Sequence, residues 1–264
     1  MALIQFGEAL RYALQVQYIG KNYAGSQIQF ENGKEINTPT IQGELEKAIS
    51  TLIFGNTENN NRQIKTIFSG RTDKGVNSKG QVVHFDIDKP IVASQFVYHL
   101  NEILPKDISV SDLEQVNDKF HAQKSAKKRF YRYVFINRKY KNAFDGDLMR
   151  IKYEINIERM QKSLNYLLGE HDFSSFKSSG TLNPSKICFI EKAECKKDGD
   201  KVIIDIVGNR FLYNMVRTIV GTLLEIEGHN LQAEHMKEVL EICDRTKAGQ
   251  TVSPFGLTLM KVEY

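Results

Sequence analysis

A carboxylate-bearing residue, Asp73, stands in a short segment that two glycines bracket, Gly70 and Gly75. This bracketing predicts a tight loop, because glycine tolerates backbone angles that other residues avoid. A carboxylate there has four chemical uses: to bind a metal ion, to cap a helix, to act as a general base, or to attack as a nucleophile. The simplest alternative is a turn residue that bonds its own backbone.

The rest of the sequence gives little support to a metal site or a nucleotide-binding loop. The six histidines show no short ligand spacing, and no second carboxylate follows Asp73 before Asp86. The chain contains neither a phosphate-loop nor a dinucleotide-binding fingerprint. Nothing in the pattern suggests a Ser-His-Asp triad.

Residues 119–141 combine many cations with many aromatic rings and contain no Asp or Glu. The cations are Lys119, Lys124, Lys127, Lys128, Arg129, Arg132, Arg138, Lys139 and Lys141, and the rings are Phe120, Phe130, Tyr131, Tyr133, Phe135 and Tyr140. Cations neutralise phosphates and rings stack on unpaired bases, so this basic aromatic segment is typical of a nucleic-acid surface. A solvated basic face over a half-buried strand explains the composition equally well. Strand alternation places Tyr131 and Tyr133 on one face.

The elements that must position these residues follow the same order twice. In the first half, hydrophobic patterning predicts strands at 12–19, 63–68, 81–87 and 108–116. Helices are predicted near 41–54, capped by Thr40, and near 95–104, capped by Ser94 and stopped by Pro105. In the second half, strands are predicted at 130–136, 187–195, 202–207 and 257–262, and helices at 157–168, 211–226 and 233–243. Gly169 is expected to end the first of these three helices.

Each half therefore reads β-α-β-β-α-β, which predicts an α+β fold of two ferredoxin-like halves. We expect the halves to join into a broad, mainly antiparallel sheet with a central catalytic cleft. The predicted domains are residues 1–117, which carry the Asp73 loop, and residues 118–264, which carry the basic aromatic segment.

Composition places the chain in an ordinary class. It has 264 residues, a formal net charge of +4 and three cysteines, Cys188, Cys195 and Cys243, without a Cys-x-x-Cys pair. An odd number of isolated cysteines favours reduced thiols in a cytoplasmic protein. Residues 1–11 include Glu8 and lack a long apolar run, so we expect neither a signal peptide nor a membrane span there.

Several motifs resemble, in order along the chain, those of the tRNA pseudouridine synthase A family. They are residues 70–76 with 80–85, residues 120–122 with 131–133, residues 168–176, residues 209–217 with 219–221, and the ending 256–257 with 262–264. Together the matches run from about Tyr12 to Tyr264, which is nearly the whole chain.

The resemblance implies an isomerase that converts uridine to pseudouridine in the anticodon stem-loop of tRNA, without a metal or organic cofactor. It implies Asp73 as the nucleophile, and Tyr131 as the ring that stacks on the target base. It further implies that Arg217 forms an ion pair with Asp73, and that Arg71 helps to hold the displaced nucleotide. A homodimer that shares the tRNA is also implied.

The chain departs from the family pattern beside the Asp73 loop. It has Ile19 where the family commonly has Asp, Ser26 where Trp is usual, and Asn77 where His is usual. We expect the first turn, which holds Ile19, and the loop after Asp73, which holds Asn77, to contact RNA. The departures keep two alternatives open: a synthase redirected to another RNA, and a non-catalytic RNA-binding module on the same scaffold.

Overall fold

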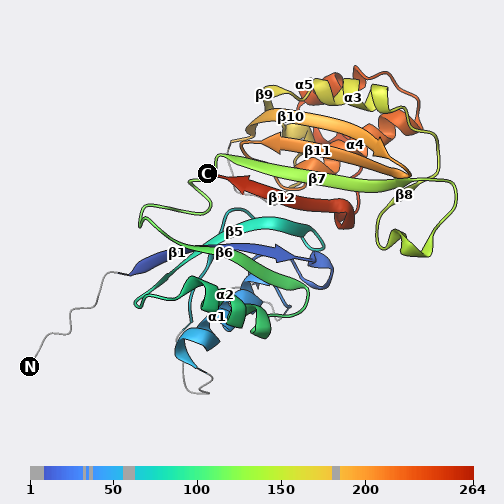
Figure 1. The fold of residues 1–264 in the computed structure, drawn as a ribbon. Helices are drawn as coiled ribbons and strands as arrows, with labels where there is room; N and C mark the ends of the chain where they lie inside the picture. The colour runs from blue at the N-terminus through green and yellow to red at the C-terminus, as the bar shows by residue number, and fades with distance from the viewer. Residues whose placement is uncertain (1–8, 32–33, 36–37, 56–62, 180–184) are drawn as a thin grey trace, which may run out of the picture. The chain divides into compact units, whose positions relative to one another are not determined.

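The computed structural model describes residues 9–31, 34–35, 38–55, 63–179 and 185–264 (Figure 1). The chain divides into two compact units: unit 1 runs to Ala126 and includes Tyr264, and unit 2 is Lys127–Glu263. The boundary between the compact units follows Ala126 and lies further along the chain than the predicted domain boundary. The domain boundary after residue 117 stays a prediction. Most of the first eleven residues, including Glu8, lie outside the described part.

Unit 1 is built on an antiparallel sheet with the strand order β6-β1-β5-β4. The strands are β1 (Leu10–Tyr18), β4 (Ile67–Phe68), β5 (Asn77–Ile87) and β6 (Ile108–Val116). In chain order this arrangement is 4-1-3-2, as the ferredoxin-like pattern requires. A separate short hairpin pairs β2 (Phe30–Glu31) with β3 (Lys34–Glu35). Strand β4 is shorter than the predicted strand 63–68.

Two helices, α1 (Ile41–Phe54) and α2 (Ala93–Ile103), cover one face of the unit 1 sheet (Figure 1). Alternate residues of β1, namely Tyr12, Leu14 and Val16, are buried in the core that the helices share with the sheet. The predicted cap of α1 is confirmed, because the Thr40 side chain accepts a hydrogen bond from Gly43 N at 3.1 Å. The predicted Ser94 cap is wrong: α2 begins one residue before Ser94, and its cap residue, Val92, has no polar side chain.

Unit 2 repeats the architecture with the strand order β12-β7-β11-β10-β9. Its strands are β7 (Lys128–Asn137), β8 (Arg150–Ile151), β9 (Gly169–Asp172), β10 (Ile187–Asp198), β11 (Lys201–Gly208) and β12 (Leu257–Glu263). All pairs are antiparallel except that of β8 with β7. The helices are α3 (Ile157–Asn165), α4 (Met215–Gly228) and α5 (His235–Ile242). The predicted α+β class with mainly antiparallel pairing is confirmed.

Two predicted helix boundaries in unit 2 are wrong, the start of α4 and the end of α3. Helix α4 begins at Met215 rather than 211, because Asn214 adopts a left-handed conformation with φ of 62° that breaks the helical path. Helix α3 ends at Asn165, and Gly169, with φ of 96°, begins β9 instead of ending the helix. Among the described residues, no helix is both long and apolar enough to span a membrane.

Candidate active site

Asp73 begins a tight turn in unit 1. Its carbonyl oxygen accepts a hydrogen bond from Val76 N at 3.1 Å, and Gly75, the third residue of the turn, has φ of 83°. A positive φ at this position is characteristic of a type II turn and favours glycine. The predicted glycine-dependent loop is therefore confirmed, and it leaves Asp73 half-buried rather than enclosed.

The residue before Asp73 is held by a buried serine. Ser26 Oγ accepts a hydrogen bond from Thr72 N at 2.8 Å, and Ser26 N donates to Thr72 O at 3.0 Å. Next to this pair, Gly25 and Asp73 form an antiparallel bridge. Ser26 is completely buried and Thr72 is 6% exposed. We call this arrangement the Ser26 latch.

A second set of buried groups holds the loop from the sheet side. The Tyr18 hydroxyl lies 2.8 Å from Thr72 Oγ1, and Gln81 Nε2 donates to Gly70 O at 3.0 Å. Ser69 Oγ in turn donates to Gln81 Oε1 at 2.5 Å. Burial raises the pKa of Tyr18, so its hydroxyl stays protonated and able to donate. The backbone on both sides of Arg71 is therefore fixed.

These anchors were missed in the sequence, although Gln81 carried a signal. It occupies the core-facing register of β5 together with Val83 and Phe85, and it is completely buried. A polar side chain in that register must be hydrogen-bonded, and the loop supplies its partners. Ser26 gave no comparable signal, because its partner lies 46 residues away.

Two of the family departures have structural roles. Ser26 is completely buried and holds Thr72 through the latch. Asn77 Oδ1 accepts a hydrogen bond from Gly20 N at 2.9 Å and fixes the turn after β1. Ile19 is 59% exposed, and its contact with RNA stays a prediction.

The other predicted site residues are divided between the units. Arg71 is exposed on the same loop as Asp73, and its Nε donates to Gln27 Oε1 at 2.5 Å. Tyr131 lies half-buried on β7 in unit 2, where its ring meets the edge of Phe211 at 5.1 Å between centroids. The predicted ion pair of Arg217 with Asp73 would connect the two units and stays a prediction.

Arg217 lies in the first turn of α4. Its Nε donates to Val252 O at 2.8 Å, and its Nη1 donates to Asn214 Oδ1 at 2.7 Å. The side chain is half-buried, so these bonds give the guanidinium group a defined direction. Its positive charge acts on the nearby Tyr133, although burial has the larger effect and raises the Tyr133 pKa.

Several cations of the basic aromatic segment have partners within unit 2. Arg132 pairs with Asp205 at 2.7 Å, Lys128 with Glu191 at 2.7 Å, and Arg138 with both Asp145 and Asp200. Arg129 Nη1 donates to Asn209 O at 2.6 Å. Part of the segment's charge therefore stabilises the fold of unit 2.

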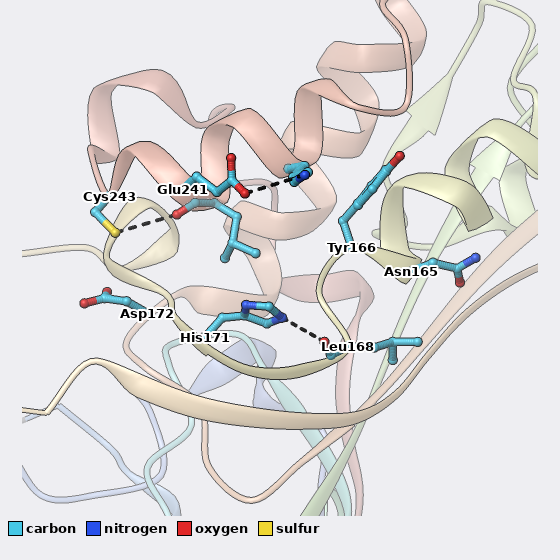
Figure 2. A pocket seen from close by; sticks show the side chains of 9 residues that line it. Asn165, Tyr166, Leu168, His171, Asp172, Glu241 and Cys243 are labelled. Atoms are coloured by element: carbon cyan, nitrogen blue, oxygen red, sulfur yellow. Dashed lines mark hydrogen bonds and ion pairs between the residues drawn. The ribbon is translucent and has the colours of Figure 1, made fainter.

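A cavity of about 400 Å³ in unit 2 is separate from all of these residues. It lies between α3, β9 and α5, and its lining includes Tyr166, His171, Lys237 and Cys243 (Figure 2). His171 Nε2 lies 2.7 Å from Leu168 O. None of the four predicted site residues lines this cavity. Within the described ranges, no three His, Cys, Asp or Glu side chains gather closely enough to hold a metal ion.

Comparison with known proteins agrees with the motifs. A family model described as tRNA pseudouridine synthase matches residues 164–264, and one for an uncharacterised protein conserved in bacteria matches residues 61–179. The tRNA pseudouridine synthase A of Thermoanaerobacter sp. is 39% identical over 94% of this chain and 97% of its own length. The tRNA pseudouridine synthase A of Anoxybacillus flavithermus is 40% identical over 96% of this chain and 98% of its own length. That of Colwellia psychrerythraea is 36% identical over 97% of this chain and 94% of its own length. Similarity at this level, over nearly the full length of each protein, means that the chain belongs to the tRNA pseudouridine synthase A family.

Proposed function

We propose that this chain converts uridine to pseudouridine in the anticodon stem-loop of tRNA, with Asp73 as the nucleophile. The observation that carries the proposal is the anchoring of Asp73: a half-buried carboxylate follows directly on Thr72, which the Ser26 latch and Tyr18 hold in place. A reactive group held in position by packed neighbours loses little freedom when the substrate binds. Membership of the family supports the reaction type.

The reaction is an isomerisation that needs no change of oxidation state. The bond from uracil N1 to ribose C1′ breaks, and a bond from C5 to C1′ forms. C5 loses a proton and N1 gains one, so atoms and electrons balance. The Asp73 carboxylate attacks either C6 of the base or C1′ of the ribose, and it is released unchanged. A neighbouring guanidinium, which we assign to Arg217, keeps a carboxylate ionised where burial would otherwise raise its pKa.

The uridine must leave the helical stack before Asp73 reaches it. Unstacking costs a few kcal/mol, and stacking on an aromatic ring returns about 1–3 kcal/mol. We assign this ring to Tyr131, whose orientation Phe211 restrains by an edge contact at 81° between the ring planes. We assign to Arg71, which is exposed on the Asp73 loop, a role in holding the displaced nucleotide.

We further propose that the enzyme acts as a homodimer in which both subunits contact one tRNA. Five lysines of the basic aromatic segment are exposed and available for the phosphates: Lys119, Lys124, Lys127, Lys139 and Lys141. Light scattering of the purified chain, with and without tRNA, tests this part: a monomer in the tRNA complex would contradict it.

The nucleophile is tested by Asp73→Asn, which preserves the shape of the side chain and removes its charge. Tritium release from tRNA that carries 5-tritiated uridine measures proton loss from C5. We expect the variant to fold, to bind tRNA and to release no tritium. The matched control is Asp88→Asn, an exposed residue of the same unit, which should keep full activity. Full activity of Asp73→Asn would refute the mechanism.

The same assay on the unaltered chain separates a synthase from a non-catalytic RNA-binding module. A synthase releases tritium, whereas a binding module releases none. The target is tested by mapping pseudouridines in a strain that lacks the gene. We expect their loss from the anticodon stem-loop of tRNA. Loss confined to ribosomal RNA would favour a redirected synthase.

A further inference from the structure

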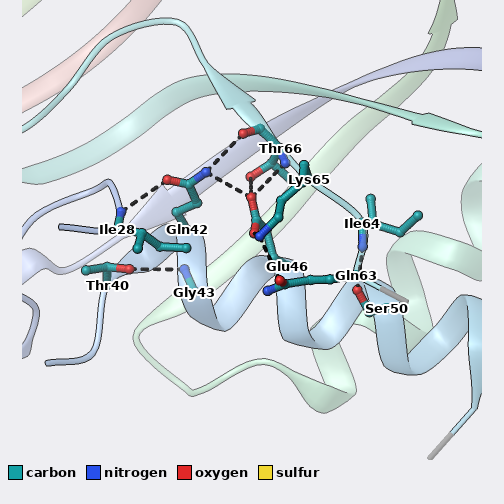
Figure 3. Close-up of polar contacts among 10 residues, drawn as sticks. All are labelled: Ile28, Thr40, Gln42, Gly43, Glu46, Ser50, Gln63, Ile64, Lys65 and Thr66. Atoms are coloured by element: carbon teal, nitrogen blue, oxygen red, sulfur yellow. Dashed lines mark hydrogen bonds and ion pairs between the residues drawn. The ribbon is translucent and has the colours of Figure 1, made fainter. Parts of the chain in front are cut away.

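A polar pair on α1, the buried Glu46 and the half-buried Gln42, stands out against the apolar face of this helix. Figure 3 shows Gln42 and Glu46 one turn apart on α1. In the sequence of the helix they alternate with the buried residues Ile41, Leu45 and Ile49. Glu46 is completely buried. A buried carboxylate is costly unless its oxygens are hydrogen-bonded. The partners of Glu46 therefore indicate what the pair holds in place.

Glu46 binds the segment that leads into β4. Its Oε1 accepts hydrogen bonds from Thr66 N at 2.8 Å and from Thr66 Oγ1 at 3.1 Å. Gln42 Nε2 donates to the same oxygen at 2.8 Å, and Lys65 Nζ donates to Oε2 at 3.3 Å. Lys65 is largely exposed and Gln42 is half-buried, so the buried part of the arrangement consists of Glu46 and Thr66.

Gln42 connects this segment to a second one. Its Oε1 accepts a hydrogen bond from Ile28 N at 3.1 Å, while its Nε2 also donates to Thr66 O at 3.1 Å. Its backbone N donates to Ser26 O at 2.9 Å. One glutamine therefore fixes the distance between residues 26–28 and residue 66.

The same two segments meet again at the Asp73 loop. The first contributes Ser26 to the latch on Thr72, and it contributes Gln27, which accepts a hydrogen bond from Arg71. The second runs from Thr66 through β4 into the loop itself. A change in their separation at Gln42 must therefore alter the latch, because both segments are short and their backbones are hydrogen-bonded.

We propose that Gln42 and Glu46 are positioning residues for the Asp73 carboxylate, acting through Ser26 and Thr66. The inference rests on the proposed role of Asp73. A fully satisfied buried network has one favourable arrangement, whereas an apolar contact tolerates sliding. The pair therefore supports the reactive geometry rather than affinity for RNA.

The test compares Gln42→Ala with Glu46→Gln in the full chain, using tritium release for kcat and KM and a filter assay for tRNA binding. Gln42→Ala removes the side-chain hydrogen bonds to Ile28, Glu46 and Thr66, but it retains helix propensity. We expect it to lower kcat by about ten- to a hundredfold, the effect of a displacement of about 1 Å in the active site. KM and the dissociation constant for tRNA should stay close to those of the unaltered chain.

Glu46→Gln is the conservative variant. Its remaining oxygen can still accept the bonds from Thr66 and Gln42, and the exposed Lys65 side chain can turn to water. We expect its kcat to stay close to that of the unaltered chain. Thr66→Val, which removes a single bond to Glu46, should lower kcat less than Gln42→Ala.

Ile49→Val is the control for general destabilisation, because this residue is buried on the same helix but makes no bond to either segment. All variants are assayed at a temperature at which circular dichroism shows them folded. The proposal is overturned if folded Gln42→Ala and Thr66→Val have unchanged kcat, or if Ile49→Val loses as much activity. An inactive Asp73→Asn beside a fully active Gln42→Ala would reject only the positioning role, whereas an active Asp73→Asn would reject the proposed function itself.

Discussion

Gly20→Ala should displace the proposed active-site loop, although Gly20 lies outside the segment that carries Asp73. A Cβ at this position would lie 2.1 Å from Val76 O and 2.8 Å from Val76 C, both backbone atoms of the turn that Asp73 begins. Real Cβ atoms essentially never approach closer than 3.0 Å, so the two segments must separate by about 0.9 Å. A misplacement of about 1 Å can cost a hundredfold in rate. Overpacking also costs about 1–3 kcal/mol of stability, which lowers the melting temperature by about 2–12 °C.

Tritium release measures the first effect and thermal unfolding, followed by circular dichroism, measures the second. The matched control is Gly70→Ala in the loop itself, because a Cβ there meets no atom of a described residue within 4 Å, its chain neighbours aside. We expect Gly70→Ala to retain the melting temperature of the unaltered chain. If Gly20→Ala has an unchanged kcat and melting temperature, the close approach of the two backbones does not control the position of Asp73.

Three further predictions concern stability. Burial, with a smaller effect of Arg11, lowers the pKa of His84 to about 4, below the value near 6.5 of the unfolded chain. The unfolded state therefore binds more protons between these values, so stability is complete above pH 6.5 and falls by up to about 3 kcal/mol towards pH 4. His84→Asn can still accept the hydrogen bond from Ala122 N, and it should reduce this pH dependence of stability, measured by urea titrations. If the change of stability with pH is the same in the variant, other groups cause it. Thr40→Ala should cost about 1 kcal/mol through loss of the α1 cap, whereas Ser94→Ala should change the urea midpoint little; equal effects would contradict the assigned caps. Gly221→Ala should destabilise unit 2 by about 3 kcal/mol or more, because its Cβ would lie 1.7 Å from Gln250 O, and a soluble variant with normal stability would refute that packing.

Local signals in the sequence were sufficient for helix α1 of unit 1. The Thr40 cap and the apolar spacing from Ile41 to Ile49 depend on residues within one helix, and they predicted α1 correctly. Helix α4 shows where such signals fail. Phe211 and Leu212 continue its apolar pattern, but the left-handed Asn214 separates them from the helix. Hydrophobic periodicity does not reveal this break, because it depends on residue types and not on the backbone conformation of a single residue.

The loop that carries Asp73 was predictable, and the groups that hold it in place were not. Glycines on both sides of Asp73 predicted a turn, since the required φ of Gly75 is a local property. The hydrogen bonds of Ser26 to Thr72 and of Glu46 to Thr66 join residues 46 and 20 positions apart. Their pairing depends on how α1 packs beside β4, which follows from the completed fold.

The ion pairs along β7 bear on how the chain would respond to salt when it binds RNA. Of the nine cations between residues 119 and 141, three have carboxylate partners and Arg129 binds a carbonyl. The other five, Lys119, Lys124, Lys127, Lys139 and Lys141, have no carboxylate partner among the described residues. The slope of log affinity against log salt is negative, and each phosphate neutralised in a complex displaces condensed counterions and adds about 0.7–0.9 to the magnitude of this slope. The segment's own share of that slope is therefore about 3.5–4.5 rather than the value of about 6–8 that nine cations would give.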